Sequence, residues 1–442
     1  MKLLHLIVCL FFVTISIQAQ NTYLHCSKIF DSETATYKTG DHTIIVRDNK
    51  IVDVIKGLAT PKQEDAIIID LRKKVVYPGF IDMHVHMENE TNPNEYLEKY
   101  QSNEADLAFK SAMFSKVTLM AGFTTVRDVG GTGVNISLRD AIEKGYVVGP
   151  RVFTAGKSLA TTGGHADPTN GGNNKYIGDP GPKDGVVNGV ADAKKAVRQR
   201  YKNGANLIKI TATGGVLSQA KNSSNPQFTI EEIKAITETA ADYGFHVAAH
   251  AHGDDGMQRA ILGGVKTIEH GTKMSDKTMK MMVDNDVYLV PTIIAGKFVT
   301  EKAQVENYYP EVVRPKALEI GPKIQDTFRK AYKMGVPIVF GTDAGVFPHG
   351  ENWKEFGYMI EVGMPVNEAI QSATLVPAKI LKKENELGQL KKGFLADIIA
   401  LDETPTEKNT EAFKNVSFVM KDGVVFKSVY KNKAFMNQNN RF

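Results

Sequence analysis

The sequence has very little cysteine, with only Cys9 and Cys26 among its 442 residues. Cys9 lies inside an apolar N-terminal segment, so a chain that loses this segment keeps Cys26 alone. A single cysteine excludes an internal disulfide, and the fold must therefore be held by its hydrophobic core. The length exceeds that of one ordinary compact domain but suits an α/β barrel with a modest addition.

Long hydrophobic runs and clustered charge are also absent. The net charge of +4 is not gathered into basic stripes, which argues against a nucleic-acid partner. The one apolar run, Leu6–Ile17, is shorter than the roughly 20 residues that span a bilayer, so we expect no stable membrane span. With Lys2 before it and Ala19 after it, residues 1–19 predict a secretory signal peptide cut near Ala19 or Gln20. We therefore expect an exported protein, periplasmic or secreted.

Both ends of the remaining chain are rich in β-branched residues. Two short runs near the N-terminus surround a polar turn and predict a β-hairpin. Similar runs return near the C-terminus, two of them around an Asp-Gly turn. The runs are Thr43–Val46, Lys50–Ile55, Ala396–Leu401, Val416–Lys421 and Val424–Lys427. We predict that residues 20–77 and 386–442 together build one small β-sandwich domain.

The middle of the chain alternates short apolar runs with amphipathic stretches. A first strand lies within Pro78–Met87, and 229–243 has the apolar spacing of a helix that begins at Thr229. The later runs are Thr124–Val129, Val152–Ala155, Leu207–Thr211, His246–His250, Thr267–Glu269, Val287–Thr292 and Pro337–Phe340. Eight strands, each followed by a helix, predict a (β/α)8 barrel over residues 78–385. The active site of such a barrel lies at the carboxyl ends of its strands.

Two histidines in the first strand suggest a metal site. The segment PGFIDMHVHM places His84 and His86 one residue apart. Residues i and i+2 of a strand point to the same face, so both imidazoles can meet one metal ion. Taken alone, the pair is equally consistent with buried histidines that serve the core.

Further ligand-type residues stand at the ends of later strands. HVAAHAHG carries His250 and His252, TIEHGT carries His270, and VFGTDAG carries Asp343. Imidazole and carboxylate are ligands of catalytic zinc, and manganese, cobalt and iron accept them too. Because these residues converge on one end of the barrel, we predict a catalytic metal site there.

Lys209 lies between Ile208 and Ile210 in the fourth strand, where an ammonium group would be buried. Burying a charge is costly without a partner. Either a neighbouring carboxylate neutralises this lysine, or its amine is chemically modified and serves as an anionic ligand between two cations.

These residues, in this order, resemble the amidohydrolase superfamily. IKITATGGVLS, FHVAAHAHG, TIEHGT and GTDAGVFPHG resemble its imidazolonepropionase-like and Xaa-Pro dipeptidase (prolidase-like) branch more closely. The resemblance covers nearly the whole chain after residue 19. It implies a barrel with a small β-sandwich and two divalent metal ions, usually zinc. It assigns His84, His86 and Asp343 to one metal, His250 and His270 to the other, and a carboxylated Lys209 to both.

The resemblance also implies a reaction. A hydroxide bridging the two metals attacks the scissile carbonyl, and Asp343 moves the proton to the leaving nitrogen. Dipeptides or N-acyl amino acids are the implied substrates, and relatives commonly form homo-oligomers. A substrate carboxylate needs polar contacts, for which we consider His165, His252 and His349. The first lies in TTGGHADP, where many relatives have glycine in place of Ala166. Each of the three also suits a role in loop structure.

Two other functions stay open at this point. One is a cyclic-amide or lactone hydrolase of the imidazolonepropionase type, although such enzymes carry one metal and lack the bridging lysine. The other is a catalytically silent binding protein that kept the barrel, against which the complete ligand set argues. Arg127 and Asp128, at the end of the second strand, are interpreted as a structural ion pair in preference to support for the metal ligands.

Overall fold

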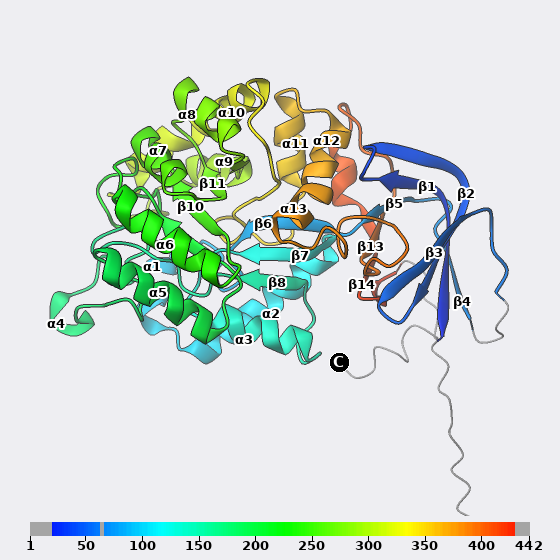
Figure 1. Cartoon of the computed structure of the whole chain (residues 1–442), viewed down its shortest axis with the longest axis horizontal. Helices are drawn as coiled ribbons and strands as arrows, with labels where there is room; N and C mark the ends of the chain where they lie inside the picture. Colours follow the sequence, from blue (N-terminus) through cyan, green and yellow to red (C-terminus); the bar gives the residue numbers. More distant parts are fainter. Residues whose placement is uncertain (1–19, 62–65, 429–442) are drawn as a thin grey trace, which may run out of the picture.

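The computed structural model describes residues 20–61 and 66–428. The predicted signal peptide, residues 1–19, lies outside these residues, and so does the end of the predicted C-terminal part, residues 429–442. The described chain forms a barrel surrounded by helices and, beside it, a smaller β-domain that contains both ends of the chain (Figure 1). The predicted fold class, a (β/α)8 barrel with a small β-sandwich domain built from both termini, is confirmed.

Seven parallel strands make up most of the barrel wall. Each lies within two residues of the run that predicted it, because β-branched and apolar residues favour a strand buried on both faces. They are β6 (Phe80–Val85), β7 (Phe123–Asp128), β8 (Arg151–Thr154), β9 (Ile208–Thr211), β10 (Val247–Ala251), β11 (Thr267–His270) and β12 (Tyr288–Val290). β6, β7 and β8 pair in order, and β9 to β12 pair in order.

Single bridges close the ring between these two groups. Leu159, just after β8, bridges to Ile210 of β9. On the other side Ile338 bridges to Leu289 of β12, and the amide of Met83 in β6 donates to the carbonyl of Phe340 at 3.0 Å. The eight segments therefore form a continuous barrel.

The prediction of a regular eighth strand at Pro337–Phe340 is wrong in detail. This segment has the position of the eighth strand but only isolated bridges to its neighbours. One reason is that the Phe340 amide donates to the carbonyl of Ser372, outside the barrel wall, at 2.9 Å. The segment then turns sharply at Asp343, whose φ is +64°.

Helices follow the strands and cover the outside of the barrel (Figure 1). They are α1 (Glu95–Gln101), α2 (Glu104–Met120), α3 (Val134–Glu143), α4 (Asn174–Ile177), α5 (Val190–Asn203), α6 (Ile230–Asp242), α7 (Asp254–Leu262), α8 (Asp276–Asp284), α9 (Ile293–Lys302), α10 (Arg314–Lys333), α11 (Lys354–Glu361), α12 (Val366–Ser372) and α13 (Leu375–Ile380). α6 is the helix predicted at 229–243. Thr229 caps it, since its hydroxyl accepts from the Glu232 amide while the Glu232 carboxylate accepts from the Thr229 amide.

The β-domain joins the two ends of the chain in one eight-stranded mixed sheet. Its strands are β1 (Asn21–Asp31), β2 (Thr36–Arg47), β3 (Lys50–Lys56), β4 (Ile67–Asp70), β5 (Val75–Pro78), β13 (Ile398–Leu401), β14 (Val416–Lys421) and β15 (Val424–Lys427). β5 connects the N-terminal and C-terminal strands, because it pairs with both β1 and β13. A separate core that includes Leu24, Ile44 and Phe418 stabilises this domain. The short 3₁₀ helix η1 (Thr410–Lys414) precedes β14.

Arg151, at the start of β8, connects the barrel to the β-domain. Its guanidinium pairs with Asp397, just before β13, at 2.5 Å and with Asp422 in the turn between β14 and β15. Arg151 and Asp397 are largely buried, while Asp422 is about a third exposed. The ion pairs therefore fix the amino end of a barrel strand against the turn of the β-domain.

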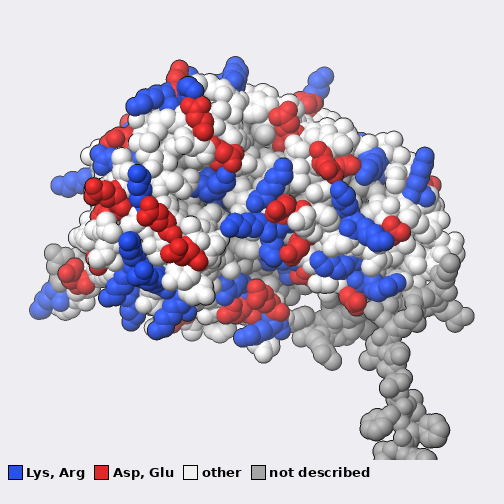
Figure 2. All heavy atoms as spheres, in the orientation of Figure 1, with Lys and Arg blue, Asp and Glu red and all other residues white. Residues whose placement is uncertain are grey.

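The outer surface carries charges of both signs. Figure 2 shows Lys and Arg side chains interspersed with Asp and Glu over the face in view. Among the described residues, no helix combines the length and the apolar character needed to cross a membrane.

The ion pair of Asp422 should make stability depend on pH. Burial raises the pKa of Asp422, but attraction to Arg151 and Lys421 outweighs burial and lowers the pKa below its usual value. A lowered folded-state pKa means that the carboxylate stabilises the fold above its unfolded pKa, about 3.9. That stabilisation is lost as pH falls through the folded pKa. We expect Asp422→Asn to lower the thermal unfolding midpoint at pH 6, with the difference from wild type shrinking below about pH 3.

The control is Asp255→Asn, which removes a more exposed partner of Arg259. This variant should have the same thermal unfolding midpoint as wild type throughout the same pH range, since exposed ion pairs contribute little to stability. A difference between wild type and Asp422→Asn that stays constant from pH 6 to pH 2.5, about 1.4 pH units below the carboxylate's usual pKa of about 3.9, would contradict the assignment.

Candidate metal centre and active site

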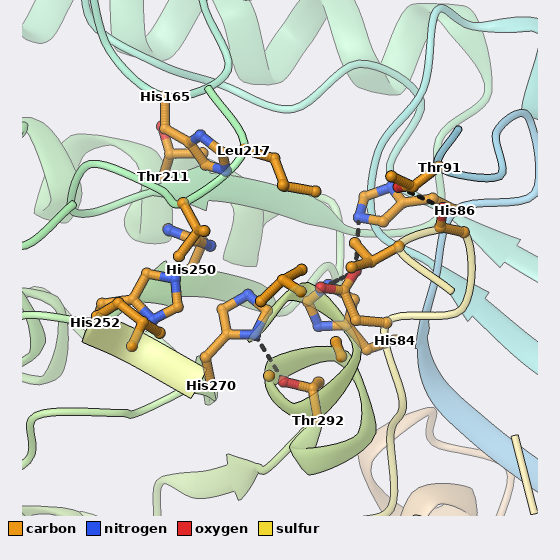
Figure 3. Close-up of a pocket in the computed structure, with 18 of the residues that line it drawn as sticks. His84, His86, Thr91, His165, Thr211, Leu217, His250, His252, His270 and Thr292 are labelled. Atoms are coloured by element: carbon orange, nitrogen blue, oxygen red, sulfur yellow. Dashed lines mark hydrogen bonds and ion pairs between the residues drawn. The ribbon is translucent and has the colours of Figure 1, made fainter. Parts of the chain in front are cut away.

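A cavity of about 290 Å³ lies at the carboxyl ends of the barrel strands. Side chains reach it from β6, β9, β10 and β11 and from the loops that follow the strands (Figure 3). The predicted site residues that line it are His84, His86, His165, Lys209, His250, His252, His270 and Asp343. Of the predicted site residues, only His349 does not line this cavity. The residues predicted to meet at the ends of the strands therefore do lie together, although they are far apart in sequence.

His84 and His86 point toward the same carboxylate oxygen. The Nδ1 of His86 donates to the carbonyl of Gly130 at 2.6 Å, which leaves Nε2 without a hydrogen. The Nδ1 of His84 lies 2.7 Å from the Glu269 carboxylate, which fixes the ring in the same way. Each Nε2 lies 3.4 Å from Oδ1 of Asp343. This is the arrangement of two metal ligands whose other ring nitrogen is held by an oxygen.

The histidines of the fifth and sixth strands, His250 and His270, also have one ring nitrogen held by a hydrogen bond. The Nε2 of His250 donates to the carbonyl of Gly214 at 3.0 Å, so its Nδ1 is free to bind. The Nδ1 of His270 bonds to the Thr292 hydroxyl at 2.7 Å. The rings of His250 and His270 are 4.7 Å apart, and His252 stacks on His270 at 5.0 Å.

These imidazoles are uncharged at neutral pH. Burial, reinforced by neighbouring positive groups, lowers the pKa of His86 to about 4 and of His252 to about 3. The same causes hold the pKa of His84, His250 and His270 well below its usual value. Neutral imidazole is the form that binds a metal ion.

The donor atoms fit divalent metal ions. Ligand atoms of His84, His270 and Asp343 lie within 4.8 Å of one another, and so do those of His250, His252 and His270. Oδ1 of Asp343 is buried without a hydrogen-bond partner. A carboxylate oxygen that faces two unprotonated nitrogens is unfavourable unless a cation lies among them. The residues therefore fit a metal centre.

Lys209 is 4% exposed and lines the same cavity. In the part of the chain described here, it forms no ion pair close enough to neutralise it, although Glu269 and Asp343 attract it from farther away. Burial lowers the pKa of Lys209 and raises that of Asp343. The first alternative from the sequence, neutralisation by an adjacent carboxylate, therefore finds no direct contact in its favour.

Three residues of the site have left-handed backbone conformations that non-glycine residues seldom adopt. The φ angle is +72° at His270, +50° at Thr292 and +64° at Asp343. Such conformations cost about 1–3 kcal/mol each and are concentrated at functional sites. The strain is greatest for a β-branched residue such as Thr292, which also holds the ring of His270. The backbone here serves the placement of side chains at the expense of stability.

Sequence reasoning missed Glu269, which lies beside His270 on β11. Its carboxylate holds His84 and also pairs with Arg127 at 2.8 Å, both side chains being fully buried. The expected ion pair between Arg127 and Asp128 is therefore wrong. The carboxylate of Asp128 instead accepts a hydrogen bond from the backbone amide of Met87 at 3.0 Å. A charged residue in an apolar strand, the signal that identified Lys209, was present at Glu269 as well.

His165 and His349 occupy different environments. His165 lines the cavity with its ring centre 4.4 Å from that of His250, and its buried Nδ1 has no hydrogen-bond partner. Gly215 lies directly against its ring, where a Cβ would clash. His349 instead stacks on Phe114 at 4.7 Å and bonds to a backbone carbonyl. The proposed substrate contact of His349 is therefore corrected to a role in loop packing.

One wall of the cavity is apolar and was not predicted. It is built by Val216, Ala295, Val299, Ile320, Ile324 and Val346. Most of these residues come from α9 and α10, which stand far from the histidine motifs in sequence. Nothing in their apolar helical spacing distinguishes residues that line a cavity from residues that fill a core.

Comparison with known proteins agrees with this geometry. Residues 75–426 match the Amidohydrolase family. Ochratoxinase from Aspergillus niger is 32% identical over 379 residues, which are 80% of this chain and 76% of the relative. A crystal structure described as a Xaa-Pro dipeptidase with methionine bound in the active site is 50% identical. It covers 92% of this chain and 100% of its own with a TM-score of 0.88. Imidazolonepropionase from Fusobacterium nucleatum is 25% identical over 81% of this chain and 84% of its own.

The buried pair of Arg127 and Glu269 should be important for stability. Glu269→Gln keeps the shape and an acceptor for His84 but leaves the Arg127 guanidinium buried without a countercharge. We expect a loss of about 3–5 kcal/mol in the free energy of unfolding, measured by urea denaturation.

The matched control is Glu98→Gln, which removes the same charge from a pair with Lys110 that is more than a third exposed. It should cost at most about 1 kcal/mol. Equal stability of the two variants would contradict the role assigned to Glu269.

Proposed function

The chain belongs to the amidohydrolase family and hydrolyses amide C–N bonds, and from this premise we propose that it is an exported two-metal dipeptidase. Its substrates are dipeptides or N-acyl amino acids, and it releases the C-terminal residue. The observation that carries the proposal is the unpartnered Oδ1 of Asp343, held 3.4 Å from both His84 and His86. This oxygen lies where a hydrolytic metal centre needs both a ligand and a base.

The chain supplies ligands for two metal ions, which we take to be zinc. His84, His86 and Asp343 would hold one ion and His250 and His270 the other, with a carboxylated Lys209 contacting both. Bound there, divalent ions lower the pKa of water and polarise the scissile carbonyl. Burial of Lys209 without an ion pair supports its role as a modified ligand, because it leaves the amine without a countercharge.

Asp343 is the residue that moves the proton. It lies at the carboxyl end of the eighth barrel segment with its side chain 11% exposed, inside the cavity. A carboxylate there accepts a proton from the attacking water and delivers it to the leaving nitrogen. The delivery is required because an amide anion is a very poor leaving group.

His165 and His252 are proposed to bind the substrate carboxylate. The Nδ1 of His252 is held by the Thr272 hydroxyl at 2.9 Å, and the rest of the ring lines the cavity. His165 has a buried ring nitrogen without a partner in the same cavity. Both groups offer hydrogen bonds to an anionic end of the substrate.

The alternative, a cyclic-amide or lactone hydrolase of the imidazolonepropionase type, has weaker support. The resemblance to imidazolonepropionases implies one metal and no bridging lysine, whereas this chain has Lys209 in the cavity. The chain is also 50% identical to the Xaa-Pro dipeptidase structure, against 25% for the imidazolonepropionase.

Export and self-assembly belong to the same proposal. The N-terminal segment supports export, with cleavage near Ala19 or Gln20. α2 supports assembly into a homo-oligomer, since it exposes Phe109, Met113 and Val117 at four-residue spacing.

The experiment that tests the function is hydrolysis of a dipeptide library by zinc-loaded protein, with free amino acid as the readout. Metal analysis of the same protein should give close to two ions per chain. Release of C-terminal residues supports the proposal. Two bound metals with no release from any dipeptide or N-acyl amino acid would move the substrate to cyclic amides or lactones. One bound metal would favour the imidazolonepropionase type.

We expect Asp343→Asn to lower kcat by about 10²–10⁴-fold, the usual effect of losing an acid–base group. Most of the metal should remain bound, because the amide oxygen still acts as a ligand. Steady-state kinetics and metal analysis of the same preparation measure both quantities. Turnover near the wild-type value would overturn the proton-transfer role.

Lys209→Ala should instead lose metal as well as activity. The comparison variant is Lys266→Ala, which removes a partly exposed lysine paired with Asp286 and should keep both. Normal metal content in Lys209→Ala would refute the ligand assignment.

A further inference from the structure

Glu95, the first residue of α1, lines the active-site cavity but has no partner for one of its carboxylate oxygens. That oxygen, Oε2, is buried and makes no hydrogen bond. Glu95 forms no ion pair with any side chain of the described residues; Lys99 attracts it only from a distance. Burial therefore raises the pKa of Glu95 to about 7, and the nearby Thr91 hydroxyl and Lys99 lower it only in part. A buried carboxylate oxygen that faces a cavity lacks a donor that a bound molecule can supply.

The position of Glu95 places this oxygen at one end of the cavity. Glu95 follows Thr91 by four residues, and the Thr91 hydroxyl, which donates to the carbonyl of Gly345 at 3.1 Å, lies close enough to influence the pKa of Glu95. Figure 3 shows Thr91 beside His86, on the far side of the site from His250 and His252. A molecule that lies across the metal centre therefore has Glu95 at one end and His252 at the other.

The two ends of the cavity differ in charge. His252 lies near the ammonium groups of Lys273 and Lys316, which help to lower its pKa. At the other end, an adjoining hollow of about 570 Å³ shares Glu95 and His165 with the cavity and adds Glu88, Glu90, Glu98 and Asp167. Lys99 and Lys110 also line it, and Lys110 is already paired with Glu98 at 2.8 Å. The arrangement suits a substrate with an anionic end and a cationic end.

We propose that Glu95 binds the α-ammonium group of the substrate's N-terminal residue and so makes the enzyme select dipeptides over N-acyl amino acids. The side chain of that residue would then lie on the apolar wall formed by Val299, Ile320 and Ile324. This assignment rests on the proposed amide hydrolysis and narrows its substrate class to molecules with a free amino group. Glu95 is a specificity-determining residue in this scheme and takes no part in bond cleavage.

The test compares two substrates that differ only in the amino group. They are Met-Pro and its des-amino analogue, 4-(methylthio)butanoyl-proline, each incubated with the metal-loaded full chain. Wild type should favour Met-Pro by about 10–100-fold in kcat/KM, the range expected for a buried charged hydrogen bond. Glu95→Gln should lower kcat/KM for Met-Pro by a similar factor, mainly through KM. It should leave the des-amino substrate within about threefold of wild type.

Glu104→Gln is the matched control, since it removes the same charge from an exposed residue at the start of α2 that lines neither the active-site cavity nor the adjoining hollow. Its substrate ratio should equal that of wild type, and the wild-type ratio tests the proposal even where a variant fails to fold. Equal hydrolysis of both substrates by wild type would overturn the assignment of Glu95 while the proposed function stands. A wild-type preference that persists in Glu95→Gln would do the same. Hydrolysis of neither substrate, nor of any other dipeptide or N-acyl amino acid, would overturn the proposed function and this assignment with it.

Discussion

The buried ion pair between Arg127 and Glu269 is the interaction on which the candidate metal site depends. It lies inside the barrel and joins β7 to β11, while the Arg127 Nε donates to the carbonyl of Met83 on β6 at 2.6 Å. Because the second oxygen of Glu269 holds Nδ1 of His84, the same network fixes which nitrogen of that ring faces Asp343. Two buried charges are costly to bring out of water, and here they determine the orientation of His84, a proposed metal ligand.

The other proposed ligands are held by uncharged groups in place of a charge. Carbonyl oxygens orient His86 and His250, and the hydroxyl of Thr292 orients His270. The left-handed conformations at His270 and Asp343 turn the chain sharply as the strands end, so both side chains remain in the cavity. The apolar core of the barrel must compensate for this strain.

The sequence could predict the residues that regular geometry places at the site. A period of two puts His84 and His86 on one face, and parallel strands bring their carboxyl ends together with His250 and His270. The same reasoning could not find Glu95 or the apolar wall, because these come from helices whose rotation depends on tertiary packing. It also predicted a regular strand before Asp343, where hydrogen bonds divided between the barrel and Ser372 leave only bridges. His349 was misplaced because a loop histidine carries no periodic signal.

The charges at the two ends of the cavity also bear on the length of the substrate. A dipeptide offers an ammonium and a carboxylate separated by one scissile amide, which matches Glu95 at one end and His252 at the other. A peptide extended at its amino end would place a neutral amide beside the buried carboxylate of Glu95. A peptide extended at its carboxyl end would place a neutral amide beside His252. A desolvated polar group without its partner costs far more than a poor apolar fit, so such substrates are rejected strongly. Under the proposed function, the same groups that bind the ends of a dipeptide exclude cleavage inside a protein chain.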